Sequence, residues 1–118
     1  MKRPKQVVVS GFQDLSEGAF SLSYYFPKDG KLCWLSMHAT DEAGDPFPIT
    51  ETITFTSDSP ISADYDTLLK SVSLAAAADY FWAPESLQFA RSQALAVAIT
   101  AAGGVGIVYV TMQVELER

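Results

Sequence analysis

The chain has 118 residues, a length that suits one domain with a single hydrophobic core. Hydrophobic residues make up 48% of it and charged residues 19%, which excludes an intrinsically disordered chain, because disorder requires low hydropathy and high net charge. The formal net charge of −6 argues against a nucleic-acid partner, since affinity for phosphates comes from clustered Lys and Arg side chains. Composition therefore predicts a soluble globular domain.

Residues 1–18 fit a regular strand pattern least well. They hold one short apolar run of three valines, flanked by basic and glycine residues. We interpret residues 1–18 as an extended arm that adds a strand to a neighbouring subunit, and residues 19–118 as the folded domain. The alternative is a frayed, solvated terminus. The residues expected to contact a partner are Lys2, Arg3, Lys5, Val7, Val8 and Val9.

Residues 19–26 alternate between apolar and polar side chains, the period of a strand with one buried face. The side chains expected on that face are Phe20, Leu22, Tyr24 and Phe26. Residues 27–30 read Pro-Lys-Asp-Gly, which favours a tight turn, because proline presets φ and glycine tolerates positive φ. We therefore expect a hairpin into a strand over residues 31–40.

Residues 49–57 carry the clearest strand pattern of the chain. Threonines occupy every second position, as on a solvent-facing sheet surface, and apolar residues or a glutamate lie between them. Shorter strands are expected over residues 67–74 and 80–82. The four alanines at 75–78 are too few to nucleate an isolated helix.

Residues 93–101 and 106–117 are expected to form a final hairpin about the glycines near position 104. The apolar stretch 94–110 is near the shortest length of a membrane helix, but glycines interrupt it and regular alternation follows it. We therefore expect no membrane span, and no signal peptide is visible. About eight short strands with turn signals between them predict an all-β, antiparallel sandwich of the jelly-roll type.

Catalytic chemistry is not expected. The sequence contains one histidine, His38, and one cysteine, Cys33; their odd separation points them to opposite faces of a strand. One His and one Cys also fall short of the three or four ligands of a zinc site. We therefore expect no enzyme, no metal centre and no cofactor. A single cysteine also suits a protein made in a reducing cytoplasm.

Two binding hypotheses remain beside plainer ones. The acidic segment 58–66 offers oxygen ligands to calcium, although it lacks the glycine and spacing of an EF-hand loop, so a polar loop is the favoured interpretation. Aromatic side chains offer a platform for stacking sugars, with Trp82 and Tyr80 as the first candidates beside Phe81, Trp34 and the pair Tyr24-Tyr25. Alternate aromatics in strands more often belong to the core.

Four segments carry a resemblance to a known family: Leu-Cys-Trp-Leu-Ser-Met-His at 32–38, Glu-Thr-Ile-Thr-Phe-Thr-Ser-Asp at 51–58, Ala-Asp-Tyr-Asp-Thr-Leu-Leu at 63–69, and Phe-Trp-Ala-Pro at 81–84. With these segments the chain resembles the small jelly-roll or β-sandwich domains of structural proteins in tailed-bacteriophage virions. The likeness covers about three-quarters of the chain. It departs at residues 91–93, Arg-Ser-Gln, where such sequences often have Gly-Asp.

The resemblance implies a non-enzymatic virion component present in many copies. Within that class it favours a capsid decoration or cement protein on the capsid surface, bound to the major capsid protein and assembled as a homotrimer. The alternatives are a tail, neck or fibre component, whether or not it contacts a receptor, and a carbohydrate-binding module. Because the shared segments are turn and core positions, the resemblance bears more directly on fold than on role.

Overall fold

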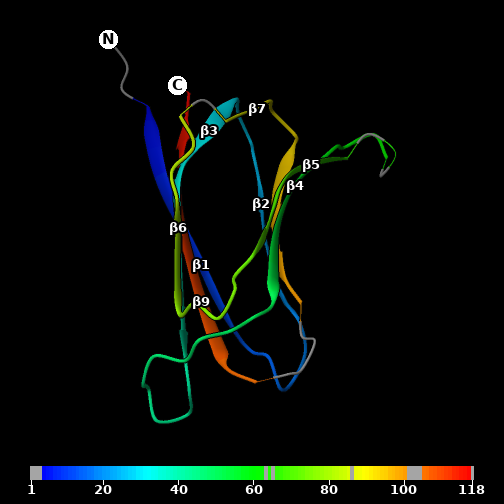
Figure 1. Cartoon of the computed structure of the whole chain (residues 1–118). Coiled ribbons are helices and arrows are strands. Elements are labelled where there is room, and N and C mark those ends of the chain that lie inside the picture. Colours follow the sequence, from blue (N-terminus) through cyan, green and yellow to red (C-terminus); the bar gives the residue numbers. More distant parts are fainter. Residues whose placement is uncertain (1–3, 63, 65, 86, 101–104, 118) are drawn as a thin grey trace.

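The computed structural model describes residues 4–62, 64, 66–85, 87–100 and 105–117. Within these residues the regular elements are nine strands (Figure 1). They are β1 (Lys5–Asp14), β2 (Phe20–Tyr25), β3 (Gly30–Thr40), β4 (Thr52–Asp58), β5 (Thr67–Ser73), β6 (Asp79–Trp82), β7 (Gln88–Phe89), β8 (Ala94–Ile99) and β9 (Ile107–Leu116). No helix in the described part of the chain is long and apolar enough to cross a membrane.

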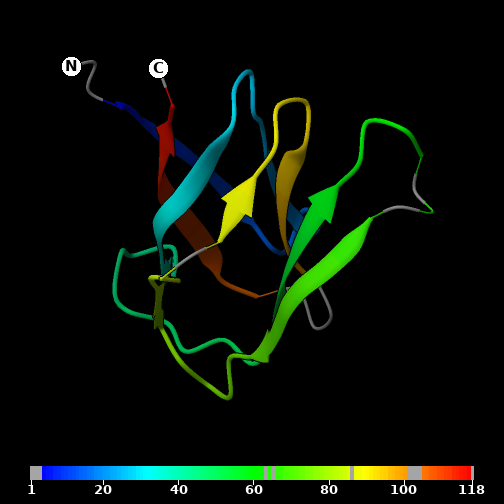
Figure 2. The ribbon, with the colours of Figure 1, turned by 90° about the horizontal axis from the view of Figure 1, so that it is seen from above.

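The strands form two antiparallel sheets that face each other (Figures 1 and 2). The five-stranded sheet has the order β1-β9-β3-β6, with the short β7 also paired to β3. The four-stranded sheet has the order β2-β8-β4-β5. The predicted all-β antiparallel sandwich is thereby confirmed.

The connectivity is that of a jelly roll. The described pairs β4·β5, β3·β6, β2·β8 and β1·β9 join the first half of the chain to the second half in reverse order. The chain can be described as one long hairpin whose tip lies between β4 and β5. This hairpin is rolled up so that its successive strand pairs fall in alternate sheets. Nine strands appear where about eight were expected, and β7, of two residues, is the one without a sequence signal.

Both hairpins expected from turn composition are wrong. β2 lies in the four-stranded sheet and β3 in the five-stranded sheet, so residues 26–29 cross between sheets. β8 and β9 are separated in the same way; the glycines at 103 and 104 lie outside the described residues. The physical reason is that alternation specifies one buried face for each strand, and a crossover buries that face as well as a hairpin does.

The arm interpretation of residues 1–18 is wrong for residues 5–14. These residues form β1, which pairs with β9 along its whole length, from Lys5 opposite Leu116 to Asp14 opposite Ile107 (Figure 1). The sandwich therefore begins before residue 19. The three successive valines concealed the period of two, because Val8 points outward between two valines that pack against the core. Lys2 and Arg3 lie outside the described residues.

The core lies between the sheets and takes alternate residues from both. β9 supplies five buried side chains at every second position from Val108 to Leu116. Phe26 and Phe89 stack with ring centroids 4.6 Å apart, which closes the end of the sandwich beside β7. The expected inward face of β2 is confirmed, since its serines are exposed and Phe20 is buried. Burial of this apolar area is the main term that stabilises the fold.

Candidate functional site

The residues predicted to bind a partner divide between two sides of β1. Val7 and Val9 are partly buried and pack against the core, whereas Val8 is 62% exposed on the outer face of the five-stranded sheet. Lys5 begins the strand and is exposed. The structure thus presents one of the three valines to solvent.

One edge of β1 faces no other described strand. β1 ends the five-stranded sheet and pairs only with β9 among the strands described. The Leu15 backbone N–H donates to the Gly106 carbonyl at 2.9 Å, on the side of β9. Because backbone groups alternate along a strand, the N–H groups of even-numbered residues from Gln6 to Asp14 point to the free edge. Among the described residues, no strand pairs with the backbone donors and acceptors on this edge of β1; at its end the Asp14 carbonyl accepts from the Glu17 N–H at 2.9 Å.

β1 is the longest of the edge strands. It has ten residues and its ladder shows no register shift. The other edges among the described strands are β7, with two residues, β6, with four, β2, with six, and β5, with seven and a register shift against β4. Natural proteins usually shorten, twist or charge such edges, because an open edge accepts strands from other chains. On β1 such protective residues occur only at the ends of the strand. Pro4 precedes it, and its charged residues are the first, Lys5, and the last, Asp14.

Trp82 and Tyr80 face the interior. The Trp82 ring lies 4.5 Å from the ring of Phe55, centroid to centroid, and Tyr80 lies 6.4 Å from the same ring. The Lys70 ammonium lies 5.1 Å from the Trp82 ring centroid and covers it from β5. Burial raises the pKa of Tyr80 above its ordinary value. The core interpretation is therefore confirmed for both rings, and they form no exposed stacking platform.

Four aromatic rings gather instead on the outer face of the five-stranded sheet, in two stacked pairs. Phe12 of β1 and Tyr109 of β9 stack with centroids 6.0 Å apart and planes 26° apart. Trp34 of β3 and Phe81 of β6 stack with centroids 6.3 Å apart and planes 23° apart. Phe12 is 71% and Phe81 64% exposed. We call this surface the aromatic face.

A histidine–aspartate pair joins the aromatic face beside Tyr109. Nδ1 of His38 on β3 lies 2.7 Å from Oδ1 of Asp79 on β6. The side chains are 44% and 75% exposed, so the remaining polar atoms are accessible. Nothing in the sequence pattern indicated this pair, because Asp79 is 41 residues from His38. The two residues are brought together by the pairing of β3 with β6, in which they are opposite each other.

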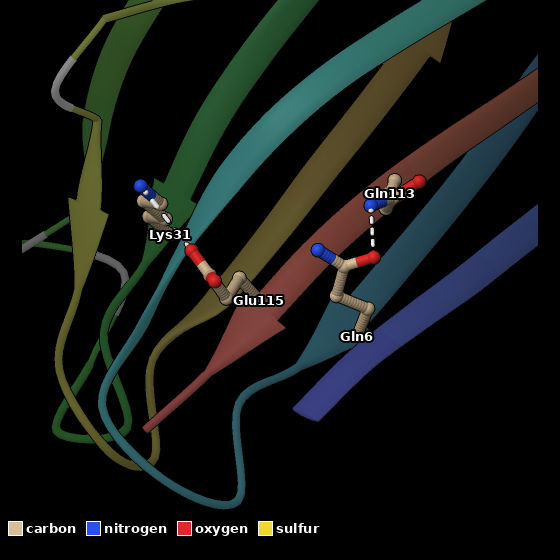
Figure 3. A network of polar contacts seen from close by, with 4 residues as sticks. All are labelled: Gln6, Lys31, Gln113 and Glu115. Atoms are coloured by element: carbon tan, nitrogen blue, oxygen red, sulfur yellow. Dashed lines mark hydrogen bonds and ion pairs between the residues drawn. The ribbon is translucent and has the colours of Figure 1, made fainter. Parts of the chain in front are cut away.

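Polar contacts occupy the other end of the face (Figure 3). Lys31 Nζ lies 3.2 Å from Glu115 Oε2, between β3 and β9. Nε2 of Gln113 donates to Oε1 of Gln6 at 2.8 Å, between β9 and β1. Both charges at this end are therefore paired within the molecule.

Cys33 lies at the irregular point of β3, where the register against β9 shifts between Leu32 and Trp34. Burial, and then the neighbouring Glu115 charge, raise the pKa of its thiol, while Lys31 lowers it. Burial therefore disfavours the thiolate, the form of cysteine that acts as a nucleophile. No group of three or more His, Cys, Asp or Glu among the described residues is arranged to hold a metal ion.

The acidic segment after β4 is described in part, since residues 63 and 65 lie outside the described residues. The Ser59 N–H donates to Asp66 Oδ1 at 2.8 Å, which folds the segment back on itself. Burial, and then the Asp66 charge, raise the pKa of Asp58. The described contacts are hydrogen bonds and charge interactions within the segment, and the calcium hypothesis stays a prediction.

Comparisons with known proteins name no family for this chain. No family model matches it, and no curated protein matches it. Among solved structures it is similar to one described as "Crystal structure of PirA", with 15% identity over 95% of this chain and 93% of that chain, and a TM-score of 0.47. A likeness at that level carries no inference about function.

Proposed function

We propose that this chain is a non-enzymatic structural protein of a tailed-bacteriophage virion. In this proposal it is a capsid decoration or cement protein, which binds the major capsid shell and reinforces it through its sandwich and its N-terminal strand. It acts as a homotrimer on the capsid surface. The resemblance of residues 31–118 to virion jelly-roll domains supports the class, and the jelly-roll connectivity agrees with that resemblance.

The observation that carries the proposal is the free edge of β1. A ten-residue regular strand with one open edge is a template for a strand from a partner, and backbone hydrogen bonds then supply much of the affinity. This replaces the extended arm of the sequence interpretation. The chain does not reach out to add a strand to its neighbour; it receives one beside β1.

The test uses a proline that removes an edge-facing N–H and leaves the ladder to β9 intact. Val8 has its N–H on the free edge, and proline is tolerated at such positions of edge strands. The matched control is Ser23→Pro on β2, the edge strand of the other sheet. The Phe26 N–H donates to Gln93 toward β8, so by alternation the Ser23 N–H also points to a free edge.

The measurement is co-sedimentation of each variant with capsids stripped of accessory proteins. We expect Val8→Pro to weaken binding to the capsids at least about tenfold, because it removes a hydrogen bond at the edge of β1. Ser23→Pro should bind the capsids about as tightly as the unchanged protein. Equal binding of all three proteins would remove the edge from the mechanism. Density for the chain on a tail or fibre in a particle reconstruction would contradict the capsid assignment, and light scattering that shows a monomer would contradict the trimer.

A further inference from the structure

The aromatic face has an internal order set by the strand register. The outward residues Ser10, Thr111 and Ser36 are opposite one another on β1, β9 and β3 and form a row of hydroxyl groups across the sheet. Phe12, Tyr109 and His38 form the next row on one side. Val8, Gln113 and Trp34 form the next row on the other side. Successive rows are about 6.7 Å apart, two residues along each strand.

The row of hydroxyl groups ends at an aromatic ring. Ser36 is opposite Phe81 on β6, so Phe81 closes the row on that side. The centre of the surface is therefore polar and its margins are aromatic. A protein–protein interface has the reverse order, with an apolar centre inside a polar rim. The arrangement instead suits a ligand that has many hydroxyl groups and also flat apolar faces.

The surface is hollowed between its rows. An open hollow of about 580 Å³ is lined by Ser10, Gly11, Phe12, Tyr109, Val110 and Thr111. The hollow is open to solvent, so it offers a surface on which a ligand can lie and not an enclosed pocket. The wall is formed by the stacked rings of Phe12 and Tyr109, and the hydroxyl groups of Ser10 and Thr111 lie beside it. Aromatic faces attract polarised C–H groups, because their π-systems are negative above and below the ring.

The charges of the surface argue against an anionic ligand. Lys31 is paired with Glu115, and His38 with Asp79. Among the described outward residues of this face no other Lys or Arg occurs, so an anionic ligand would find no free cation. His38 Nε2 and Asp79 Oδ2 remain available to exchange hydrogen bonds with hydroxyl groups.

We propose that the outer face of the five-stranded sheet binds a neutral glycan. Tyr109 and Phe12 stack on sugar rings at one margin, and Trp34 and Phe81 do so at the other. The hydroxyl row and the His38–Asp79 pair bind sugar hydroxyl groups between them. Tyr109 and Phe81 lie off β1, so this site can be tested separately from the edge-strand attachment proposed above.

The two tryptophans of the chain allow a direct assay, because Trp34 is on the aromatic face and Trp82 is packed against Phe55. In the full chain with Trp82→Phe, fluorescence reports Trp34 alone. The probes are cellohexaose, maltohexaose and xylohexaose, with hexagalacturonate as the anionic counterpart. We expect a saturable fluorescence change with at least one neutral hexasaccharide and none with hexagalacturonate.

Variants then locate the binding. In the Trp82→Phe background, Tyr109→Ala and Phe81→Ala should each weaken binding at least about tenfold, the scale of a lost stacking contact. Tyr25→Ala is the matched control, since Tyr25 is 59% exposed but lies on the other sheet. Thermal unfolding of each variant separates lost binding from lost folding.

Three results would overturn the proposal. They are the absence of a saturable change with every neutral hexasaccharide, preference for hexagalacturonate, and binding that Tyr109→Ala and Phe81→Ala leave intact. If the same two variants weaken capsid binding and no glycan binds, the face is a protein interface and the glycan assignment is wrong.

Discussion

Phe55 and Trp82 meet across the sandwich, with ring centroids 4.5 Å apart and planes inclined by 56°. Phe55 comes from β4 in the four-stranded sheet and Trp82 from β6 in the five-stranded sheet. The contact closes the side of the sandwich on which β5 and β6 are the edge strands, and Lys70 covers the Trp82 ring there. Trp82 is thus a structural side chain that joins the two sheets.

Phe55→Ala should destabilise the protein by about 3–5 kcal/mol, because a fully buried ring is lost and a cavity remains. The measurement is the free energy of unfolding in urea, followed by tryptophan fluorescence. Phe81→Ala is the control, since Phe81 is 64% exposed and its loss should cost within about 0.5 kcal/mol. Similar losses for the two variants would contradict the assignment of inner and outer aromatic rings.

Gly30→Ala should destabilise the protein by about 1–3 kcal/mol through overpacking. A Cβ at Gly30 would collide with the carbonyl oxygen of Glu115, where β3 and β9 approach closely, and backbone on a central ladder cannot move aside easily. The midpoint of thermal unfolding is the measurement, with Ser23→Ala on exposed β2 as the neutral control. An unchanged midpoint for Gly30→Ala would show that β3 and β9 are further apart than described.

Asp14 should titrate below its ordinary pKa of 3.8. The Ser16 hydroxyl and then the Ser16 backbone N–H donate to its carboxylate, and both hydrogen bonds lower the pKa. Because the folded-state pKa is depressed, the stabilisation is present above the pKa of the unfolded chain and is lost as pH falls through the folded-state pKa.

Ser16→Ala should therefore raise the pKa of Asp14 toward 3.8, measured by NMR titration of its carboxyl carbon. The internal reference is Asp58, whose pKa is raised by burial and then by the Asp66 charge, and which does not contact Ser16. A constant pKa of Asp14 in the variant would show that the hydroxyl donates no hydrogen bond in solution.

The pair of His38 and Asp79 should contribute little to stability. Both side chains are substantially exposed, and ion pairs in solvent are worth about 0–1 kcal/mol. Asp79→Asn should therefore leave the urea midpoint nearly unchanged, while it alters the polar centre of the aromatic face. A large loss of stability would show that the pair holds β6 to β3.

The strands and their buried faces could be predicted in most cases because the signal is local. Phe20 to Phe26 and the threonine strand of β4 alternate as a half-buried strand requires, and the structure buries the expected sides. β1 was missed as a strand because three successive valines hide the alternation. β7 was missed because two residues carry no period.

The candidate site could be predicted only in part. Aromatic residues were singled out, yet composition could not tell Trp82, which faces inward, from Phe81, which faces outward one residue earlier on β6. One residue of register exchanges the two faces of a strand, and that register is decided by pairing with β3. The pairing of His38 with Asp79 depends on the same ladder.

The sequence by itself determined the class of this protein: an all-β chain with alternate residues buried, since the period of two is a property of each strand alone. Only the tertiary structure decided which strands pair. The Val7–Val9 segment became an ordered edge of the sheet because β9 offered it a ten-residue ladder, and the expected hairpins became crossovers because the rolled connectivity buries the same faces. Strand pairing depends on residues distant in sequence, so the local pattern of a strand does not indicate which strand it pairs with.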